Sequence, residues 1–174
     1  MIDKSIKFFG INIAILTISD TRNFDNDKSG STLRKLVEDC GHTCILRDIV
    51  KDEPKELLSI FNKWTNNKNL DVIITTGGTG LTGRDITVDV LETYFDKKID
   101  GFGELFRQLS YQELGTSTIQ SRAFAGLANS TIIFCLPGST GACKTGWNKI
   151  IREQLNSLFE PCNFANIVGR KTHQ

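Results

Sequence analysis

The chain has 174 residues, of which 39% are hydrophobic, and 21 basic against 20 acidic side chains give a formal net charge of +1. This balance disfavours a nucleic-acid partner, because binding a phosphate polymer normally requires a basic surplus. The apolar runs are far shorter than the roughly 20 residues that span a bilayer, so we expect no membrane segment.

The N-terminal segment places a basic residue before an apolar stretch, as a secretory signal peptide does. Asp3 and Asn12 interrupt that stretch and no small-residue cleavage site follows, so we interpret residues 11–18 as a buried strand. The chain has five cysteines, which cannot all pair within the chain, and we see no secretion signal. This usage indicates reduced thiols and a cytoplasmic protein.

Short β-branched runs alternate with segments of helical periodicity along the rest of the chain. The predicted strands are residues 11–18, 43–49, 71–76 and 131–136. The predicted helices are residues 31–40, a segment from Pro54 through Trp64, a segment carrying Val88, Leu91 and Phe95, and residues 101–114, 120–127 and 142–158. The tail, residues 161–174, shows no clear period and is expected to pack on a neighbour or to fray.

This alternation predicts an α/β fold of one domain, residues 1–174, with right-handed crossovers, a mostly parallel sheet and helices on both faces. In such sheets ligands bind outside the carboxyl ends of the strands. The polar or glycine-rich segments that leave those ends are residues 19–23, 50–54, 77–85 and 136–141.

The segment TTGGTGLTGRD, residues 75–85, matches the dinucleotide-binding pattern G-x-G-x-x-G through Gly78, Gly80 and Gly83. That pattern usually follows the first strand, whereas here it follows the third. The spacing of Gly78 and Gly83 also suits a P-loop, but Arg84 and Asp85 stand where Lys and Ser/Thr belong. Because glycines allow close backbone approach and a helix follows, we predict an anion cradle made by Gly77, Gly78, Thr79 and Gly80.

The two residues after this cradle carry opposite charges. Arg84 is suited to bidentate phosphate binding. Asp85 would repel a phosphate unless a cation lies between them, so one interpretation makes it a Mg²⁺ ligand that bridges to a nucleoside triphosphate. The other makes it the N-cap of the following helix, and the sequence favours neither.

A second turn, at residues 136–141, is also typical of an anion cradle. Pro137 and Gly138 end the fourth predicted strand, and Ser139 opens a run of N–H and hydroxyl donors before a helix. Cys143 lies in that helix, and we interpret it as a buried, inert thiol because no base accompanies it in the sequence.

Three other features carry weaker signals. Ser121 and Arg122 pair a hydroxyl with a bidentate anion binder, although a surface helix would explain them equally. Asp52 follows the second strand and is either a site acid or an N-cap. The cluster CGHTC, residues 40–44, lacks the fourth ligand of a structural metal site, so we interpret it as a helix end with Gly41 as the left-handed residue.

Together these pieces resemble the MoaB/MogA family of molybdenum cofactor biosynthesis. The resemblance rests on TISDT (17–21), DKSG (27–30), TTGGTG with RD (75–80, 84–85), GFGE.FR (101–107), SR.FAG (121–126) and LPGS (136–139). These matches run in order along nearly the whole chain, so they are far more specific than any single motif. GTSTIQSRAFAG and PGST.AC.T.W look particularly like the MoaB branch.

The resemblance implies a three-layer α/β/α sandwich and adenylyl transfer from Mg-ATP to molybdopterin. The terminal phosphate of the pterin attacks the α-phosphorus of ATP, pyrophosphate leaves, and AMP-molybdopterin forms. Such chemistry needs positioning and charge neutralisation and no protein nucleophile. The family also implies a homotrimer or homohexamer, for which Phe102, Phe106 and Tyr111 are candidate contacts, and other molybdenum-cofactor proteins as further partners.

Site residues are implied in the same way, position by position. Asp85 and Asp52 correspond to the catalytic acids, with Asp85 as the metal ligand. The implied nucleotide-binding residues are Gly77, Gly78, Thr79, Gly80, Arg84 and Asp20. The implied pterin-binding residues are Ser121, Arg122, Pro137, Gly138 and Ser139.

The chain departs from the family pattern in the second turn. Many active members read PGNP where this chain has Ser139 and Thr140, and many carry Lys where Gly141 stands; Lys144 lies one helical turn further on. These changes leave open an alternative, a non-catalytic molybdopterin-binding or complex-forming protein of the same pathway. A phosphotransferase is a weaker alternative, since Arg84 and Asp85 replace the P-loop Lys and Ser/Thr.

Overall fold

The computed structural model describes residue 2 and residues 7–168, so Asp3 and the end of the tail, residues 169–174, lie outside the described residues. Six strands form a sheet in the order β2-β1-β3-β6-β5-β4. The strands are β1 Asn12–Ile18, β2 Thr43–Val50, β3 Val72–Thr76, β4 Lys97–Lys98, β5 Phe124–Ala128 and β6 Thr131–Leu136. The longer helices are α1 Lys28–Asp39, α2 Pro54–Thr65, α3 Thr87–Tyr94, α4 Asp100–Leu114 and α5 Thr140–Gly146.

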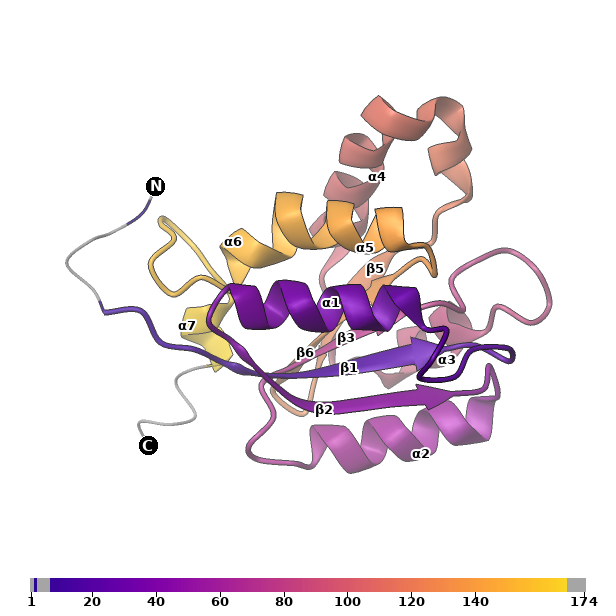
Figure 1. Ribbon diagram of the computed structural model, residues 1–174, viewed down its shortest axis with the longest axis horizontal. Helices are drawn as coiled ribbons and strands as arrows, with labels where there is room; N and C mark the ends of the chain where they lie inside the picture. The colour runs from indigo at the N-terminus through magenta and orange to yellow at the C-terminus, as the bar shows by residue number, and fades with distance from the viewer. Residues whose placement is uncertain (1, 3–6, 169–174) are drawn as a thin grey trace.

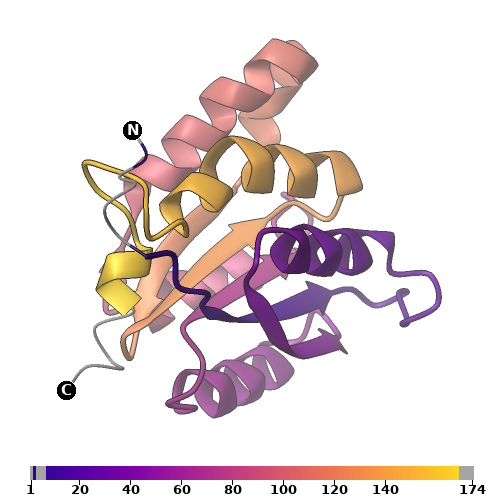
Figure 2. The same cartoon turned by 60° about the vertical axis from the view of Figure 1, so that its left-hand side comes forward.

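Helices cover both faces of the sheet, which confirms the three-layer α/β/α sandwich (Figures 1 and 2). Helices α1, α4 and α5 contribute side chains to one hydrophobic cluster, and α2 and α3 contribute to the other. Strand β1 serves both, since Ile13 and Ile15 face the first cluster and Ala14 and Leu16 face the second. This burial on both faces is the reason why the strand is a nearly unbroken apolar run.

The sheet is mixed. Strands β2, β1, β3 and β6 are parallel neighbours, whereas β5 and β4 join the edge in antiparallel order. The prediction of a helix over residues 120–127 is therefore wrong: a 3-10 helix, η1 Gly115–Gln120, precedes strand β5. A Cβ at Gly126 would collide with the ring of Phe95, so this glycine allows the strand to lie beneath that ring. Tertiary packing here overrides the local helical spacing.

The antiparallel strand has a direct consequence for the site. Because Phe124 pairs with Cys135, strand β5 begins at the edge where β6 ends. Residues 121 and 122, just before β5, therefore lie at the same edge as the loops that leave β1, β3 and β6. The sequence had suggested this proximity only through the family resemblance.

Other expectations need smaller corrections. The helix predicted over 142–158 begins earlier, as α5, and continues through a π-helical segment, η2 Trp147–Ile151, into α6 Arg152–Gln154. Phe102 and Phe106 are buried in the first cluster, because α4 turns that face toward the sheet, and so they are not exposed contacts. Tyr111 is exposed, as expected.

The cluster at residues 40–44 has the predicted helix-end geometry. Helix α1 ends at Asp39, Gly41 has φ of +81°, and β2 begins at Thr43. His42 is buried beside the Trp147 ring, and burial lowers its pKa to about 4. A short helix, α7 Ala165–Val168, lies in the described part of the tail. No helix within the described residues is both long and apolar enough to cross a membrane.

Candidate functional site

The two predicted anion cradles are neighbours in the structure. The N–H of Gly77 donates to the Leu136 carbonyl at 3.0 Å, and the Thr76 hydroxyl donates to the Pro137 carbonyl at 3.0 Å. A Cβ on Gly138 would approach the Gly77 Cα to 3.4 Å. Strands β3 and β6 are paired, so the turns that leave them form one site at the carboxyl edge of the sheet.

The backbone of the first cradle requires glycine at two positions. Gly77 and Gly78 have φ of +106° and +63°, in the left-handed region that L side chains rarely adopt. A Cβ at Gly77 would collide with the Ile18 carbonyl oxygen, and one at Gly78 would collide with the Thr87 hydroxyl and lie 2.9 Å from the Asp52 carboxylate. The glycines therefore let the loop pass close to β1 and to a buried acid.

Asp85 is not a helix N-cap. Helix α3 begins at Thr87, with Ile86 as its N-cap. The Asp85 carboxylate instead accepts bonds from the Thr82 N–H at 3.0 Å and the Thr82 hydroxyl at 2.5 Å. The Thr82 hydroxyl lowers the pKa of Asp85, with further help from the N–H groups of Thr82 and Gly80, while partial burial opposes the change. The side chain is thus held ionised in the wall of a cavity.

Asp52 is the buried acid behind this loop, with 8% of its surface exposed. Its Oδ1 atom accepts the Ile86 N–H at 3.4 Å, whereas the N-cap of α2 is Glu53, so Asp52 is not that cap either. Burial, with the charges of Asp85 and Asp20, raises its pKa to about 6, while the bond from Ile86 opposes the change. The three carboxylates are therefore electrostatically coupled.

Arg84 joins three loops beside the first cradle. Its Nη2 and Nε atoms donate to Asp20 at 2.6 and 3.1 Å, and its Nη1 atom donates to Glu53 at 3.3 Å. The hydrogen bond from Arg84 lowers the pKa of Asp20. Arg84 is exposed, and exposed ion pairs contribute little stability, so its guanidinium can exchange these carboxylates for a phosphate at small cost.

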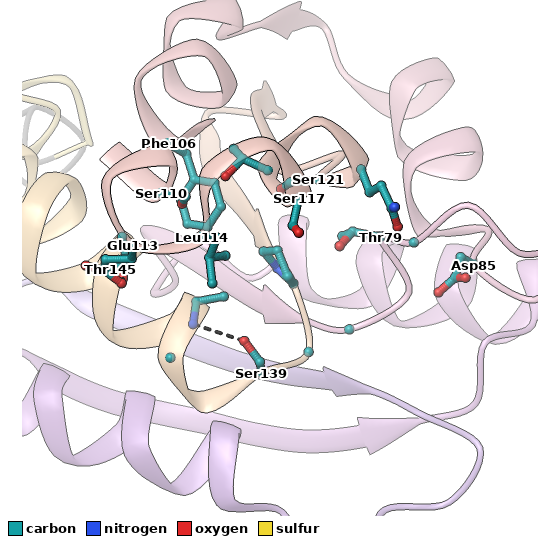
Figure 3. Close-up of a pocket in the computed structure, with 18 of the residues that line it drawn as sticks. Thr79, Asp85, Phe106, Ser110, Glu113, Leu114, Ser117, Ser121, Ser139 and Thr145 are labelled. Carbon is teal, nitrogen blue, oxygen red and sulfur yellow. Dashed lines mark hydrogen bonds between the residues drawn. The ribbon is translucent and has the colours of Figure 1, made fainter. Parts of the chain in front are cut away.

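A cavity of about 520 Å³, within the usual range of ligand sites, connects the two cradles to η1 and α4. Asp85 and Thr79 lie toward one end of it, and Glu113 and Thr145 lie toward the other (Figure 3). Phe106 and Leu114 line the space between them (Figure 3). The cavity thus has a carboxylate toward each end, with apolar side chains and hydroxyl groups between them (Figure 3).

The predicted pterin-binding residues are placed unevenly around this cavity. Ser121, Pro137, Gly138 and Ser139 line it. The Ser139 hydroxyl accepts the Ala142 N–H at 3.1 Å and so caps α5. Arg122 is turned toward the glycine loop, where its guanidinium binds the carbonyl oxygens of Gly80 and Asp85.

Comparison with known proteins places this cavity in a recognised domain. Residues 14–157 match the family model described as "Probable molybdopterin binding domain". The chain belongs to the MoaB/MogA family of molybdenum cofactor biosynthesis proteins. The matched range contains all of the cradle residues and both acids.

Relatives in the family match along nearly their full length. Molybdenum cofactor biosynthesis protein B of Escherichia coli K12 is 44% identical over 164 residues, which cover 94% of this chain and 96% of that protein. The protein of the same name in Staphylococcus aureus strain COL is 46% identical over 156 residues, covering 85% and 89%.

Solved structures of the family agree with the fold. One crystal structure of a molybdenum cofactor biosynthesis protein B has a TM-score of 0.85 and 36% identity, and the match covers 95% of this chain and 98% of that one. The tungsten cofactor synthesizing protein MoaB of Pyrococcus furiosus has a TM-score of 0.75 and 35% identity, covering 84% and 92%.

Sequence reasoning missed the wall that η1 and the end of α4 supply to the cavity. Phe106 and Leu114 form its apolar part, and Thr118 lies beside them with a buried hydroxyl that has no hydrogen-bond partner within the described part of the chain. The only signal was the helical spacing of Phe106, Ser110 and Glu113, which puts these three side chains on one face of α4. That spacing does not say what the face covers.

The donor set fits a magnesium ion that arrives with a nucleotide. Within residues 7–168, no group of three or more His, Cys, Asp or Glu side chains is placed to hold a metal by itself. Magnesium, however, usually takes one or two carboxylates together with waters and substrate phosphates. Asp85 supplies one ionised carboxylate beside residues 77–80, where such phosphates would lie.

Proposed function

We propose that this protein catalyses Mg-ATP-dependent adenylyl transfer to molybdopterin. The observation that carries the proposal is the cavity that joins the glycine loop and Asp85 to an apolar wall with hydroxyl groups. A nucleotide triphosphate suits the first part and a flat heterocycle suits the second, so one cavity would hold both reactants. Bringing two reactants together in this way accounts for much of the rate of group transfer.

In this proposal the backbone N–H groups of residues 77–80 bind the ATP phosphates. Arg84 leaves its carboxylate partners and binds the same phosphates. Asp85 would hold the Mg²⁺ ion, with Asp20 and Asp52 nearby. The ion would neutralise charge on the phosphates and on the departing pyrophosphate. Asp52, whose pKa of about 6 lies near neutral, would then be held ionised by the added positive charge.

The remaining part of the cavity would take the pterin. Phe106 and Leu114 would contact the ring faces, and hydroxyl groups such as that of Ser121 would bind its polar edge. The turn at Pro137 and Gly138 lines the same cavity beside the first cradle, and there the terminal phosphate of the pterin would meet the α-phosphorus. The phosphate oxygen bonds to the α-phosphorus and the bond to pyrophosphate breaks.

One observation favours a second candidate, a protein that binds the pterin without adenylating it. The Ser139 hydroxyl is used as a helix cap, and Gly141 brings no side chain to the same cavity. This turn therefore offers fewer groups to the terminal phosphate of the pterin than an Asn and a Lys would. A binding protein would retain the pterin affinity and lack turnover.

The experiment mixes the purified protein with Mg-ATP and molybdopterin and follows AMP-molybdopterin by mass spectrometry. We expect the wild type to form it, and Asp85→Asn to form it at least about 100-fold more slowly, as loss of a preorganised charge-stabilising group does. Asp39→Asn is the control, because Asp39 is an exposed carboxylate at the end of α1, outside the cavity lining. Pterin binding without product by the wild type would establish the second candidate.

We also propose that the chain forms a homotrimer or a homohexamer, as its family resemblance implies. The exposed side chains of Tyr111, Leu114 and Ile119, the last 84% exposed, offer an apolar contact around the end of α4 and η1. Light scattering after size-exclusion chromatography tests this, and a monomeric mass would refute it.

A further inference from the structure

We propose that Arg122 is a positioning residue that fixes the segment from Gly80 to Asp85 and thereby places the Asp85 carboxylate. Its effect on catalysis rests on the proposed function above, whereas its effect on the loop does not. The Arg122 side chain turns from the cavity toward the loop.

The guanidinium of Arg122 binds both ends of the same short segment. Its Nε atom donates to the Gly80 carbonyl at 2.8 Å, and its Nη2 atom donates to the Asp85 carbonyl at 2.5 Å. A third contact, from Nη1 to the Asp89 carboxylate at 3.2 Å, reaches the first turn of α3. A planar fork with fixed N–H directions can bind two carbonyls at once, which an ammonium group cannot do in the same geometry.

The segment between these two carbonyls has little other support. Leu81 is 67% exposed, and a Cβ at Gly83 would meet open space. Thr82 binds the Asp85 carboxylate, but Thr82 belongs to the same segment, so this bond shapes the loop without fixing it to the sheet. The Arg84 ion pairs are exposed and weak. The partly buried contacts of Arg122 are therefore suited to hold the segment from Gly80 to Asp85 in place.

Arg122 also connects the two parts of the cavity. Ser121, the preceding residue, lines the cavity from the side of η1, and Arg122 reaches from there to the loop that carries Asp85. Toward the segment from Gly80 to Asp85 the guanidinium donates to carbonyl oxygens and so holds that segment by hydrogen bonds, while its ion pair with Asp89 reaches α3. Displacing the guanidinium would loosen the segment and let Asp85 move relative to the opposite wall, although the carboxylate itself is kept.

Hydrogen–deuterium exchange of the ligand-free protein tests this directly. The hydrogen-bonded amides in the segment include those of Thr82 and Asp85, and those of Ile86 and Thr87 follow directly after it. We expect Arg122→Lys and Arg122→Ala to accelerate their exchange at least about tenfold, which corresponds to about 1.4 kcal/mol of local opening, with no change in the amides of β1 and β3. Wild-type exchange in both variants would overturn the proposal, whatever the protein catalyses.

The matched control is Arg107→Ala. Arg107 lies close in space, and its Nη1 atom also donates to a backbone carbonyl, that of Ala123 at 3.3 Å. The Arg107→Ala substitution therefore removes an arginine–carbonyl bond beside β5 and leaves the contacts of the glycine loop unchanged. If Arg107→Ala accelerates the same amides as strongly, the effect is a general loosening and the proposal is wrong.

A second measurement relates the loop to the metal. Isothermal titration with a non-cleavable ATP analogue at several Mg²⁺ concentrations should show that Arg122→Ala raises the Mg²⁺ requirement at least about tenfold, and millimolar free guanidinium should restore it. Arg122→Lys should restore little, because one ammonium group cannot bridge both carbonyls. Full restoration by lysine, or wild-type Mg²⁺ dependence with faster loop exchange, would show that the loop position does not govern metal binding.

Discussion

Replacing Asp52 by asparagine should stabilise the protein at neutral pH while it abolishes turnover. The carboxyl is buried, and its Oδ1 atom accepts one N–H bond, from Ile86. The oxygen of an asparagine amide can accept the same bond, so the substitution removes the charge and keeps the contact. Asp85 and Asp20 repel that charge, and Arg84 opposes them only in part.

The magnitude follows from the pKa. Burial raises the pKa of Asp52 from 3.8 to about 6, so the folded state binds more protons than the unfolded state between these values. The free energy of unfolding therefore falls as pH rises through this window, by at most about 3 kcal/mol above pH 7. The Asp52→Asn variant has no such loss, so its melting temperature should exceed that of the wild type by up to about 6–12 °C.

Thermal unfolding of both proteins at pH 4.5, 5.5, 6.5 and 7.5 measures this difference, with Asp39→Asn as the same change at an exposed carboxylate. We expect the advantage of Asp52→Asn to be small at pH 4.5 and to grow to a plateau near pH 7.5. A difference that does not change with pH, or a less stable variant at pH 7.5, would refute the argument that burial strains this carboxylate.

Three further expectations concern the glycine loop, the cap of α5 and the cysteines. Gly78→Ala should destabilise the protein by about 2 kcal/mol or more in urea unfolding, because of its positive φ and the Thr87 and Asp52 atoms in its way, and should weaken ATP binding. Gly83→Ala, in the same loop with open space around it, should lie within about 0.5 kcal/mol of the wild type; equal losses would contradict the assignment. Ser139→Ala should cost about 1 kcal/mol through the lost cap of α5, and an unchanged urea midpoint would exclude that role. A thiol reagent at pH 8 should modify exposed Cys162 and spare Cys143, whose pKa burial raises to about 11; rapid labelling of Cys143 would contradict this.

The sequence predicted the parallel half of the fold well, because its strands carry their own signal. Strand β1 is apolar on both faces from Ile13 to Leu16, and Pro54 marks the first residue of α2. Strand β5 could not be predicted in this way, since its alanines and its glycine fit a helix equally. Its state depends on pairing with β6 and on Phe95 packing against Gly126, which are contacts between distant residues.

The site shows the same division. Gly77 and Gly78 were predicted as a cradle, and their positive φ values confirm that the chain needs glycine there. The helix-cap interpretation of Asp85 could be excluded only with the structure, because it depends on where α3 begins and on which atoms Thr82 reaches. Phe106 was predicted to be an exposed contact and lies instead in the cavity wall, since only the packing of α4 decides which face is covered.

The most direct test of the central proposal follows the phosphorus atoms of ATP. Wild-type protein is incubated with Mg²⁺, molybdopterin and ATP labelled with radioactive phosphorus at either the α or the γ position, and the pterin product is isolated. Adenylyl transfer predicts that the pterin carries label from the α position and none from the γ position, with one pyrophosphate released per product. A pterin labelled from the γ position would indicate phosphotransfer, and an unlabelled pterin that remains bound would show that this protein holds molybdopterin without adenylating it.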